Sequence, residues 1–261
     1  MATISETCTV PGIGMEEAIM LGEDVLVSDS PRTVPSSTSQ IRKITLVFQL
    51  SAINFLASTV NGLITVGLPK IASDLNLPQE LYFWPASVYG LATGSTLLLA
   101  GSAADIIGAP VIDLVGCFGL GIFLLGGGLA QTGTELVVFR AIQGVALSLH
   151  LSSSVGIVSD SFARGRSRNI AFSFLGLSQP LGFSVGLVAG GILVDTVGWR
   201  SGWYVGGGVT LLLSLLGLWT LPRPRSRISK PRDLLELKDQ VDWVGAAIAS
   251  TFMASLSYLL A

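Results

Sequence analysis

The chain has 261 residues, of which 50% are hydrophobic and only 12% are charged, and its formal net charge at neutral pH is −2. Soluble domains usually carry about 25% charged residues, so this composition predicts an integral membrane protein. The near-neutral charge excludes a broad basic surface, and we expect no nucleic-acid partner. The two cysteines, Cys8 and Cys117, form no CxxC metal pair, and we expect no disulfide framework.

The N-terminal segment, 1–43, is acidic and rich in Ser, Thr and Pro, and it lacks the basic and apolar regions of a signal peptide. We expect a disordered tail. Six apolar windows follow, each long enough for the about 20 residues that a bilayer-spanning helix needs. They are 44–68, 82–105, 109–130, 135–158, 169–194 and 202–221. A polar linker, 222–240, precedes a seventh window, 241–261, at the end of the chain. The predicted fold class is an all-α, polytopic membrane protein.

Basic residues are concentrated in the tail and in the loops after the fourth and sixth windows. Short cytoplasmic loops collect Lys and Arg, so we expect a cytoplasmic N-terminus and linker in a multi-pass protein of the plasma membrane. The expected first turns of two helices hold Pro85 and Pro110, where a missing N–H costs nothing. All five tryptophans fall near window ends, where the headgroup layer favours such rings: Trp84, Trp199, Trp203, Trp219 and Trp243.

Short segments in the first three windows resemble segments at matching positions in the next three. Asn61-Gly62 corresponds to Gln143-Gly144, and AGSAADIIG at 100–108 corresponds to AGGILVDTVG at 189–198. Because an odd number of spans separates each pair, the copies have opposite topology. Such inverted repeats are typical of secondary transporters, although chance similarity in a glycine-rich chain is the alternative.

The fifth window, SFLGLSQPLGFSVGLVAGGILVD, combines a proline with a glycine at nearly every fourth position. Gly and Pro cost about 1 and about 3 kcal/mol relative to Ala in a helix interior, so helix propensity does not explain this segment. Within a bilayer, glycines let another helix approach closely, and proline bends a helix. The pattern predicts either a gating interface or an ordinary packing seam. Its residues are Gly176, Gln179, Pro180, Gly182, Gly186 and Gly190.

Arg140 is the charged residue that the fourth window places inside the membrane. A guanidinium there costs several kcal/mol unless it faces the bundle interior or water. Gln143 lies on the same helix face, next to Gly144. The alternative is that Arg140 snorkels to the outer interface.

Three further polar residues fall within the windows. His150, the single histidine, follows Gln143 by almost two helical turns and shares its face. It is a candidate for proton relay or for a hydrogen bond to a neighbouring helix. Asn54 and Asn61 share one face of the first window, where their amides would line a substrate cavity or hold helices together.

Taken together, these segments resemble a known family. GLSQPLGFSVGLVAGG is similar to the antiporter motif of the major facilitator superfamily. ELVVFRAIQGVALS resembles its Arg-x-x-Gln-Gly motif, and VNGLITVGLPKIASDLNLP resembles its first-helix motif. LYFWPASVYGLATGSTLLLAGSAADIIG, DTVGWRSGWY and VDWVGAAI match the fungal-type branch of fourteen-helix drug:proton antiporters. The resemblance covers nearly all of 44–261 and implies the six-helix N-terminal bundle of that fold, at 44–221.

One family motif is incomplete. The loop after the second window keeps three motif residues, Gly101, Asp105 and Gly108. The positions that are normally basic hold Ile106, Ala109 and Pro110 instead. The charge network of that loop is therefore largely absent, and Asp105 has the alternative role of a cap at the helix end.

The resemblance implies a proton-coupled exporter of drugs, toxins or secondary metabolites, in which Arg140 takes part in proton coupling. No enzyme signature is present, and we expect no cofactor and no metal, with the proton gradient as the driving force. The expected partners are a small-molecule substrate and the lipid bilayer. Because the family needs two bundles, we also expect a missing C-terminal half, whose helix would cover the glycines of the fifth window, or a second copy. The alternatives are an importer or facilitator of a small polar solute, and a truncated fragment that does not transport.

Overall fold

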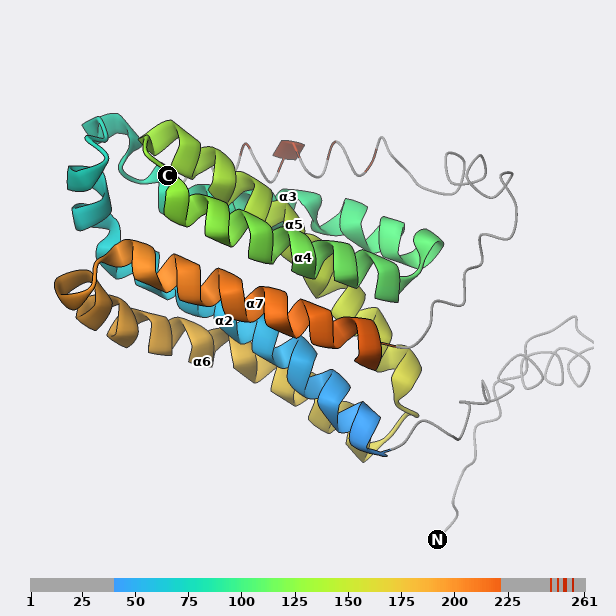
Figure 1. The fold of residues 1–261 in the computed structure, drawn as a ribbon. Coiled ribbons are helices and arrows are strands. Elements are labelled where there is room, and N and C mark those ends of the chain that lie inside the picture. The colour runs from blue at the N-terminus through green and yellow to red at the C-terminus, as the bar shows by residue number, and fades with distance from the viewer. Residues whose placement is uncertain (1–39, 222–244, 246–247, 249–250, 253–254, 256–261) are drawn as a thin grey trace, which may run out of the picture. The chain divides into compact units, whose positions relative to one another are not determined.

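The computed structural model describes residues 40–221 together with Gly245, Ile248, Thr251, Phe252 and Ser255. Between 40 and 221 the chain forms six long helices and one short 3-10 turn (Figure 1). The helices are α2 (Gln40–Asp74), α3 (Trp84–Ile107), α4 (Ala109–Leu129), α5 (Gly133–Ser161), α6 (Arg166–Thr196) and α7 (Trp199–Thr220), and the turn is η1 (Gln79–Leu81). All six helices are long and apolar enough to cross a membrane, which confirms the predicted all-α membrane fold. The predicted linker, 222–240, lies outside the described residues, as do nearly all of the tail and most of the seventh window.

Local sequence signals set several helix boundaries. α5 begins with a capping box, in which the Thr132 hydroxyl accepts from the Glu135 amide and the Glu135 carboxylate accepts from the Thr132 amide. Pro85 and Pro110 lie in the first turns of α3 and α4, as predicted. The first helix extends beyond the predicted window 44–68, because α2 begins at Gln40 and continues through Pro69 to Asp74.

The last turn of α2 persists beyond Pro69 because other contacts stabilise it. Ile71 is fully buried. The Asp74 carboxylate pairs with Lys70 at 3.0 Å and accepts a hydrogen bond of 3.1 Å from the indole N–H of Trp199. These tertiary contacts offset the backbone hydrogen bond that proline removes.

The helix packing repeats in the two halves of the bundle. α2 packs mainly against α6 and α7, and its counterpart α5 packs mainly against α3 and α4. α4 and α7 also pack against each other. Exchanging α2–α4 for α5–α7 leaves this pattern unchanged, as the inverted repeat in the sequence requires. The two glycines of the repeat are also equivalent, since Gly62 abuts the backbone of α6 and Gly144 that of α3.

The connections after α3 and α6 each contain a glycine with a positive φ angle. Gly108 has a φ of 112° and Gly198 a φ of 94°. L-amino acids with a side chain rarely adopt this region, so both turns favour glycine. The two residues stand at equivalent positions of the repeated segments that the sequence comparison aligned.

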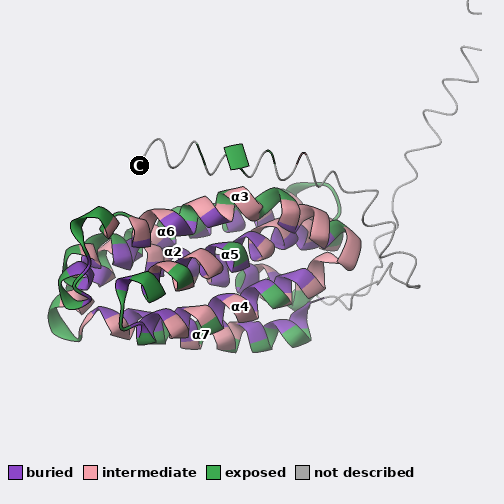
Figure 2. Ribbon diagram, turned by 90° about the horizontal axis from the view of Figure 1, so that it is seen from above, coloured by how far each residue is buried: buried purple, intermediate pink, exposed green. Residues whose placement is uncertain are grey.

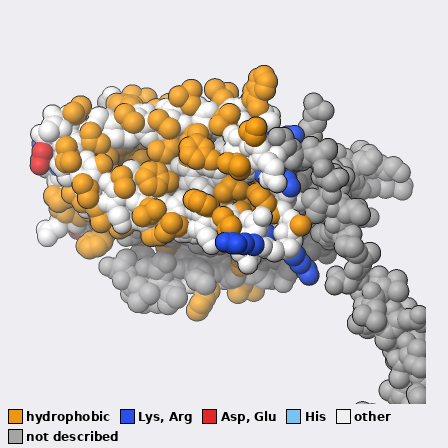
Figure 3. Space-filling view, turned by 90° about the horizontal axis from the view of Figure 1, so that it is seen from below, with side chains coloured by type: hydrophobic (Ala, Val, Ile, Leu, Met, Phe, Trp, Pro, Cys, Tyr) orange, Lys and Arg blue, Asp and Glu red, His pale blue; other side chains and the backbone are white. Residues whose placement is uncertain are grey.

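The outward surface of the bundle is apolar. Buried residues occur along all six helices, and exposed ones follow their outer faces (Figure 2). Hydrophobic side chains spread over the face drawn in Figure 3, with Lys and Arg near one end and Asp and Glu at the other. This distribution fits a lipid-facing belt between two polar ends.

Of two tryptophans near the ends of α7, one is exposed and the other is buried. Trp219, near the end of α7, is 84% exposed, as expected of a ring in the headgroup layer. Trp203 lies one turn after the start of α7 but is fully buried, so the interfacial placement predicted for it is wrong. Its ring occupies the space beside Gly127 on α4, where a Cβ atom would overlap it.

Candidate functional site

Arg140 lies at the centre of a polar cluster inside the bundle. Its side chain is fully buried on α5. Nε donates to the carbonyl oxygen of Pro85 at 3.0 Å and Nη1 to Oε1 of Gln143 at 3.3 Å, and Nη2 donates to Oδ1 of Asn61. These contacts direct the side chain into the protein, so the snorkelling alternative is wrong.

Aromatic rings flank the same guanidinium. Its carbon lies 4.1 Å from the ring centre of Tyr89 on α3 and 5.8 Å from that of Trp203 on α7. Cation–π contacts of this kind contribute about 2 kcal/mol when desolvated. Arg140 makes no ion pair with any residue in the described part of the chain. Its charge is therefore balanced there by carbonyl dipoles and rings rather than by a carboxylate.

The cluster joins several helices. The Gln143 amide donates to the Phe123 carbonyl oxygen of α4 at 2.7 Å. With the contacts of Arg140, the cluster thus connects α5 to α2, α3, α4 and α7. Gly144 has a packing role next to it, because a Cβ atom there would meet the Ala92 Cβ at 2.8 Å. Sequence reasoning grouped Arg140 with Gln143 but missed Tyr89 and Trp203, since aromatic residues in spans are too common to mark a site.

The two asparagines of α2 differ in their surroundings. Asn61 contacts Arg140, whereas Asn54 donates to the Leu175 carbonyl oxygen at 3.2 Å and to the Ser178 hydroxyl at 3.0 Å, both on α6. Ser58, one turn further along α2, donates to the Gln179 carbonyl oxygen at 2.7 Å. Of the alternatives that the sequence left open, helix-to-helix bonding therefore describes Asn54.

The glycines of α6 do permit close helix packing, but against a different partner from the one expected. A Cβ atom at Gly182 would overlap the Phe55 carbonyl oxygen, and one at Gly186 would overlap that of Thr59. At Gly190 it would lie 2.8 Å from the Cα of Leu63. The covering helix is α2 of the same bundle, so the prediction of a helix from a second bundle is wrong for these three residues. We call this contact the α2–α6 seam.

The other residues of the α6 motif face outward. Gly176, Gln179 and Pro180 are exposed, and a Cβ atom at Gly176 would have no neighbour within 4 Å. α6 continues as one helix through Pro180. The motif therefore has two faces, one packed in the α2–α6 seam and one open in the described structure.

The incomplete loop motif makes few contacts. Gly101 has open space around it, and Asp105 is exposed on the last turns of α3. Asp105 forms no hydrogen bond or ion pair with the described residues, and Gly108 rather than Asp105 terminates α3. The capping role considered for Asp105 is therefore not observed.

His150 belongs to a second polar cluster. Its Nδ1 lies 2.8 Å from Oδ1 of Asp113 on α4, and its Nε2 lies 3.3 Å from the Leu50 carbonyl oxygen on α2. It faces α4, as Gln143 does, but it shares no hydrogen bond with Arg140 or Gln143 in the part of the chain that is described. Sequence reasoning did not single out Asp113, although the predicted window 109–130 contains it. A carboxylate four residues into an apolar helix was the signal that could have found it.

The fold and the buried polar clusters define a multi-pass membrane protein. The Major Facilitator Superfamily model matches residues 50–261, and the chain belongs to that family. It is 37% identical to MFS-type transporter 1 of Pyricularia oryzae over 257 residues, which cover 88% of this chain and 42% of that protein. It is 36% identical to the puromycin resistance protein pur8 of Streptomyces alboniger over 162 residues, covering 62% of this chain and 32% of that protein.

A solved structure agrees with the fold. A bacterial homolog of the human lysosomal transporter Spinster, in an inward-facing and unoccupied conformation, matches with a TM-score of 0.58 and 18% identity. The match covers 74% of this chain and 46% of that chain. The chain thus spans less than half the length of the relatives it matches.

Proposed function

We propose that this chain is the N-terminal bundle of a proton-coupled exporter of drugs or secondary metabolites, working by alternating access. The observation that carries the proposal is the Arg140 cluster, a buried cation without a carboxylate among the described residues. Family membership supports the transporter class, and the names of the relatives, one of them a puromycin resistance protein, support export. The clustering of Lys and Arg at one end of the bundle supports a cytoplasmic N-terminus.

The Arg140 cluster suggests how binding would be coupled to movement. Its hydrogen bonds end on α2, α3 and α4, and its ring contacts include α7. A proton or substrate that draws Asn61 or Gln143 away therefore changes the contacts of α5 with α2 or with α4. Such differential contact is what a ligand needs to shift a conformational equilibrium.

Two buried polar atoms next to the cluster give such a ligand something to bind. Within the described chain, the Tyr89 hydroxyl and the Trp203 indole N–H have no hydrogen-bond partner. Buried polar groups are usually paired, so these two are available for a proton-carrying or polar group. The exposed face of Gly176, Gln179 and Pro180 is the surface we assign to the second bundle, as part of a longer chain or of a second copy.

Ethidium efflux tests this proposal. The chain is compared with a chimera in which it is joined to the C-terminal half of the Pyricularia relative, both in proteoliposomes. An imposed proton gradient should drive ethidium out through the chimera, and dissipating the gradient should abolish the flux. Ethidium movement that ignores the gradient, or none from a correctly inserted chimera, would contradict the proposal.

A further inference from the structure

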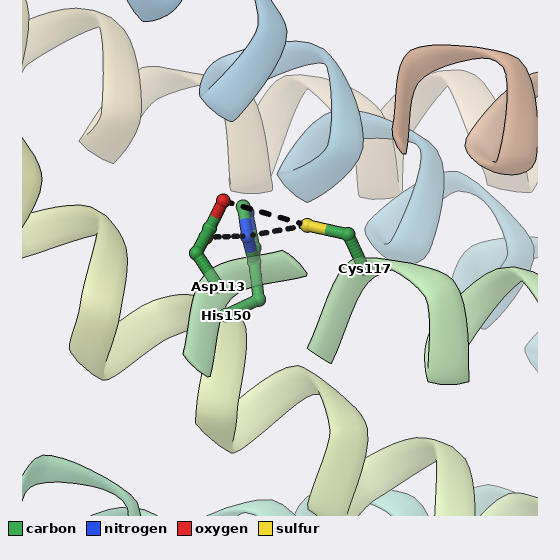
Figure 4. A group of neighbouring side chains, drawn as sticks. All are labelled: Asp113, Cys117 and His150. Carbon is green, nitrogen blue, oxygen red and sulfur yellow. Dashed lines mark hydrogen bonds and ion pairs between the residues drawn. The ribbon is translucent and has the colours of Figure 1, made fainter. Parts of the chain in front are cut away.

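Three potential metal ligands of different types meet inside the bundle, away from the Arg140 cluster (Figure 4). Asp113 and Cys117 lie one helical turn apart on α4 and face His150 on α5, and all three side chains are buried. Nδ1 of His150 lies 2.8 Å from Oδ1 of Asp113 and 3.3 Å from Sγ of Cys117, and Sγ lies 3.7 Å from Oδ2. The three ligand atoms fall within 4.8 Å of one another.

A glycine brings these short side chains within reach of one another. A Cβ atom at Gly116 would lie 2.8 Å from the Ala146 carbonyl oxygen and 2.8 Å from the His150 amide nitrogen. Helices usually pack with their axes about 8–10 Å apart, a separation that Asp and Cys bridge poorly. The close approach at Gly116 therefore fixes the ligand positions through backbone packing, which is the preorganisation that a metal site needs.

The third helix sets the tautomer of the histidine. Nε2 of His150 lies 3.3 Å from the Leu50 carbonyl oxygen of α2. A carbonyl oxygen only accepts, so Nε2 carries a hydrogen, and Nδ1 is the nitrogen that faces the Asp113 carboxyl group and the Cys117 thiol. Metal-binding histidines are typically held in this way, by a carbonyl or carboxylate on the nitrogen that does not bind the ion.

We propose that Asp113, Cys117 and His150 bind one divalent transition-metal ion, for which Zn²⁺ is the best match. Zinc takes nitrogen, sulfur and oxygen ligands at about 2.0–2.3 Å, which in a tetrahedron separates the ligand atoms by about 3.3–3.6 Å. Nδ1 of His150 lies 2.8 Å from Oδ1 of Asp113 and 3.3 Å from Sγ of Cys117, both within about half an ångström of these values. Sγ lies 3.7 Å from the other carboxylate oxygen, Oδ2, so a rotation of the carboxylate sets the remaining separation. The second carboxylate oxygen or a water molecule completes the coordination.

Charge balance favours a divalent ion at this depth in the bundle. A carboxylate, a thiolate and a neutral imidazole together neutralise a 2+ ion, so the occupied site carries no net charge in a low-dielectric interior. Because metal ligands bind in their deprotonated forms, binding releases protons from the site. This proposal stands independently of the transport function.

Metal content measures the site directly. Because the ligands are buried, metal is supplied during expression, and the purified full chain is analysed for bound cobalt. Tetrahedral Co²⁺ with a thiolate ligand has a characteristic visible and near-ultraviolet spectrum. We expect stoichiometric cobalt with a thiolate charge-transfer band in the wild type and in Cys8→Ser, and loss of both the ion and the band in Cys117→Ser.

A gain of signal separates a lost ligand from a misfolded variant. Asp113→Cys replaces the carboxylate with a second thiolate, and we expect it to keep cobalt and to strengthen the charge-transfer band. Absence of stoichiometric cobalt and zinc from the wild-type chain would overturn the proposal. So would cobalt that remains bound in both Cys117→Ser and His150→Gln, since the ion would then lie elsewhere.

Discussion

Arg140 shows how one residue can hold a charge inside an apolar bundle. Three of its N–H groups donate to oxygens on α2, α3 and α5, and rings of α3 and α7 lie beside it. Hydrogen bonds to charged groups contribute about 1.5–3 kcal/mol each. The fork shape of guanidinium, rather than its charge alone, satisfies acceptors in these different directions.

Arg140→Lys therefore tests shape while keeping the charge. Lysine offers a compact ammonium that cannot reach all three acceptors or stack on Tyr89, and the loss of one charged hydrogen bond corresponds to about a tenfold effect or more. We expect gradient-driven ethidium efflux through the chimera to fall by about that factor. Arg168→Lys, at the start of α6, is the matched control and should retain efflux. Equal efflux in the two variants would show that the fork geometry is unimportant.

The sequence identified single residues better than it identified their neighbours. An arginine in an apolar window is conspicuous, and so Arg140 and Gln143 were predicted. Asp113 lies four residues into α4, inside the predicted window 109–130, but it was not singled out as a charged residue within the membrane. Tyr89 and Trp203 reach Arg140 only through tertiary packing, which no periodicity in their own helices reveals.

Among the described helices, α2 and α6 share the most extensive contact, at the α2–α6 seam. Glycines on α6 face backbone atoms of Phe55, Thr59 and Leu63, one turn apart on α2. Asn54 and Ser58 of α2 add hydrogen bonds to α6. Close backbone packing combined with polar bonds is how membrane helices associate when apolar burial contributes little.

Gly186→Ala should weaken this seam. The added Cβ would overlap the Thr59 carbonyl oxygen, so α2 and α6 must move apart, at a cost of about 1–3 kcal/mol. We expect a lower thermal unfolding midpoint for the full chain in detergent. The control is Gly191→Ala, on the following turn of α6, where an added Cβ would have no neighbour within 4 Å. This variant should leave the unfolding midpoint unchanged or raise it slightly. Equal midpoints for both variants would refute the seam as a stability determinant.

Sequence periodicity predicted the seam but not its partner. The spacing of Gly182, Gly186 and Gly190 required some helix at close range, and the structure supplies α2. Which helix fills that place depends on the packing of the whole bundle. The same limit explains Pro69, which local rules place at a helix end but which tertiary contacts of Asp74 keep within α2.

At the scale of the whole bundle, length and polarity are sufficient to predict the architecture. The six windows predicted from apolar runs correspond one to one with the six helices from α2 to α7. The inverted repeat predicted from short sequence echoes is matched by the packing of α2–α4 and α5–α7. Side-chain chemistry between helices was less predictable, because it depends on rotations of each helix about its own axis.

Thiol labelling tests the orientation of the bundle. With a cytoplasmic N-terminus, a membrane-impermeant maleimide should label Glu80→Cys, in the exposed η1 turn, on intact cells. The native Cys8 should react only after permeabilisation, and Cys117 should stay unreactive because it is fully buried. Labelling of Cys8 on intact cells would reverse the assigned topology.

The packing order of α2 has a consequence for biogenesis. This helix leaves the ribosome first among the six, yet its main neighbours are α6 and α7, and it has little contact with α3. During translation, the face that carries Gly62 and Thr59 stays without its native cover until the chain has grown past Thr196. Lipid or an insertion chaperone must shield that face in the meantime. α2 therefore completes its native packing only after the later helices have been synthesised.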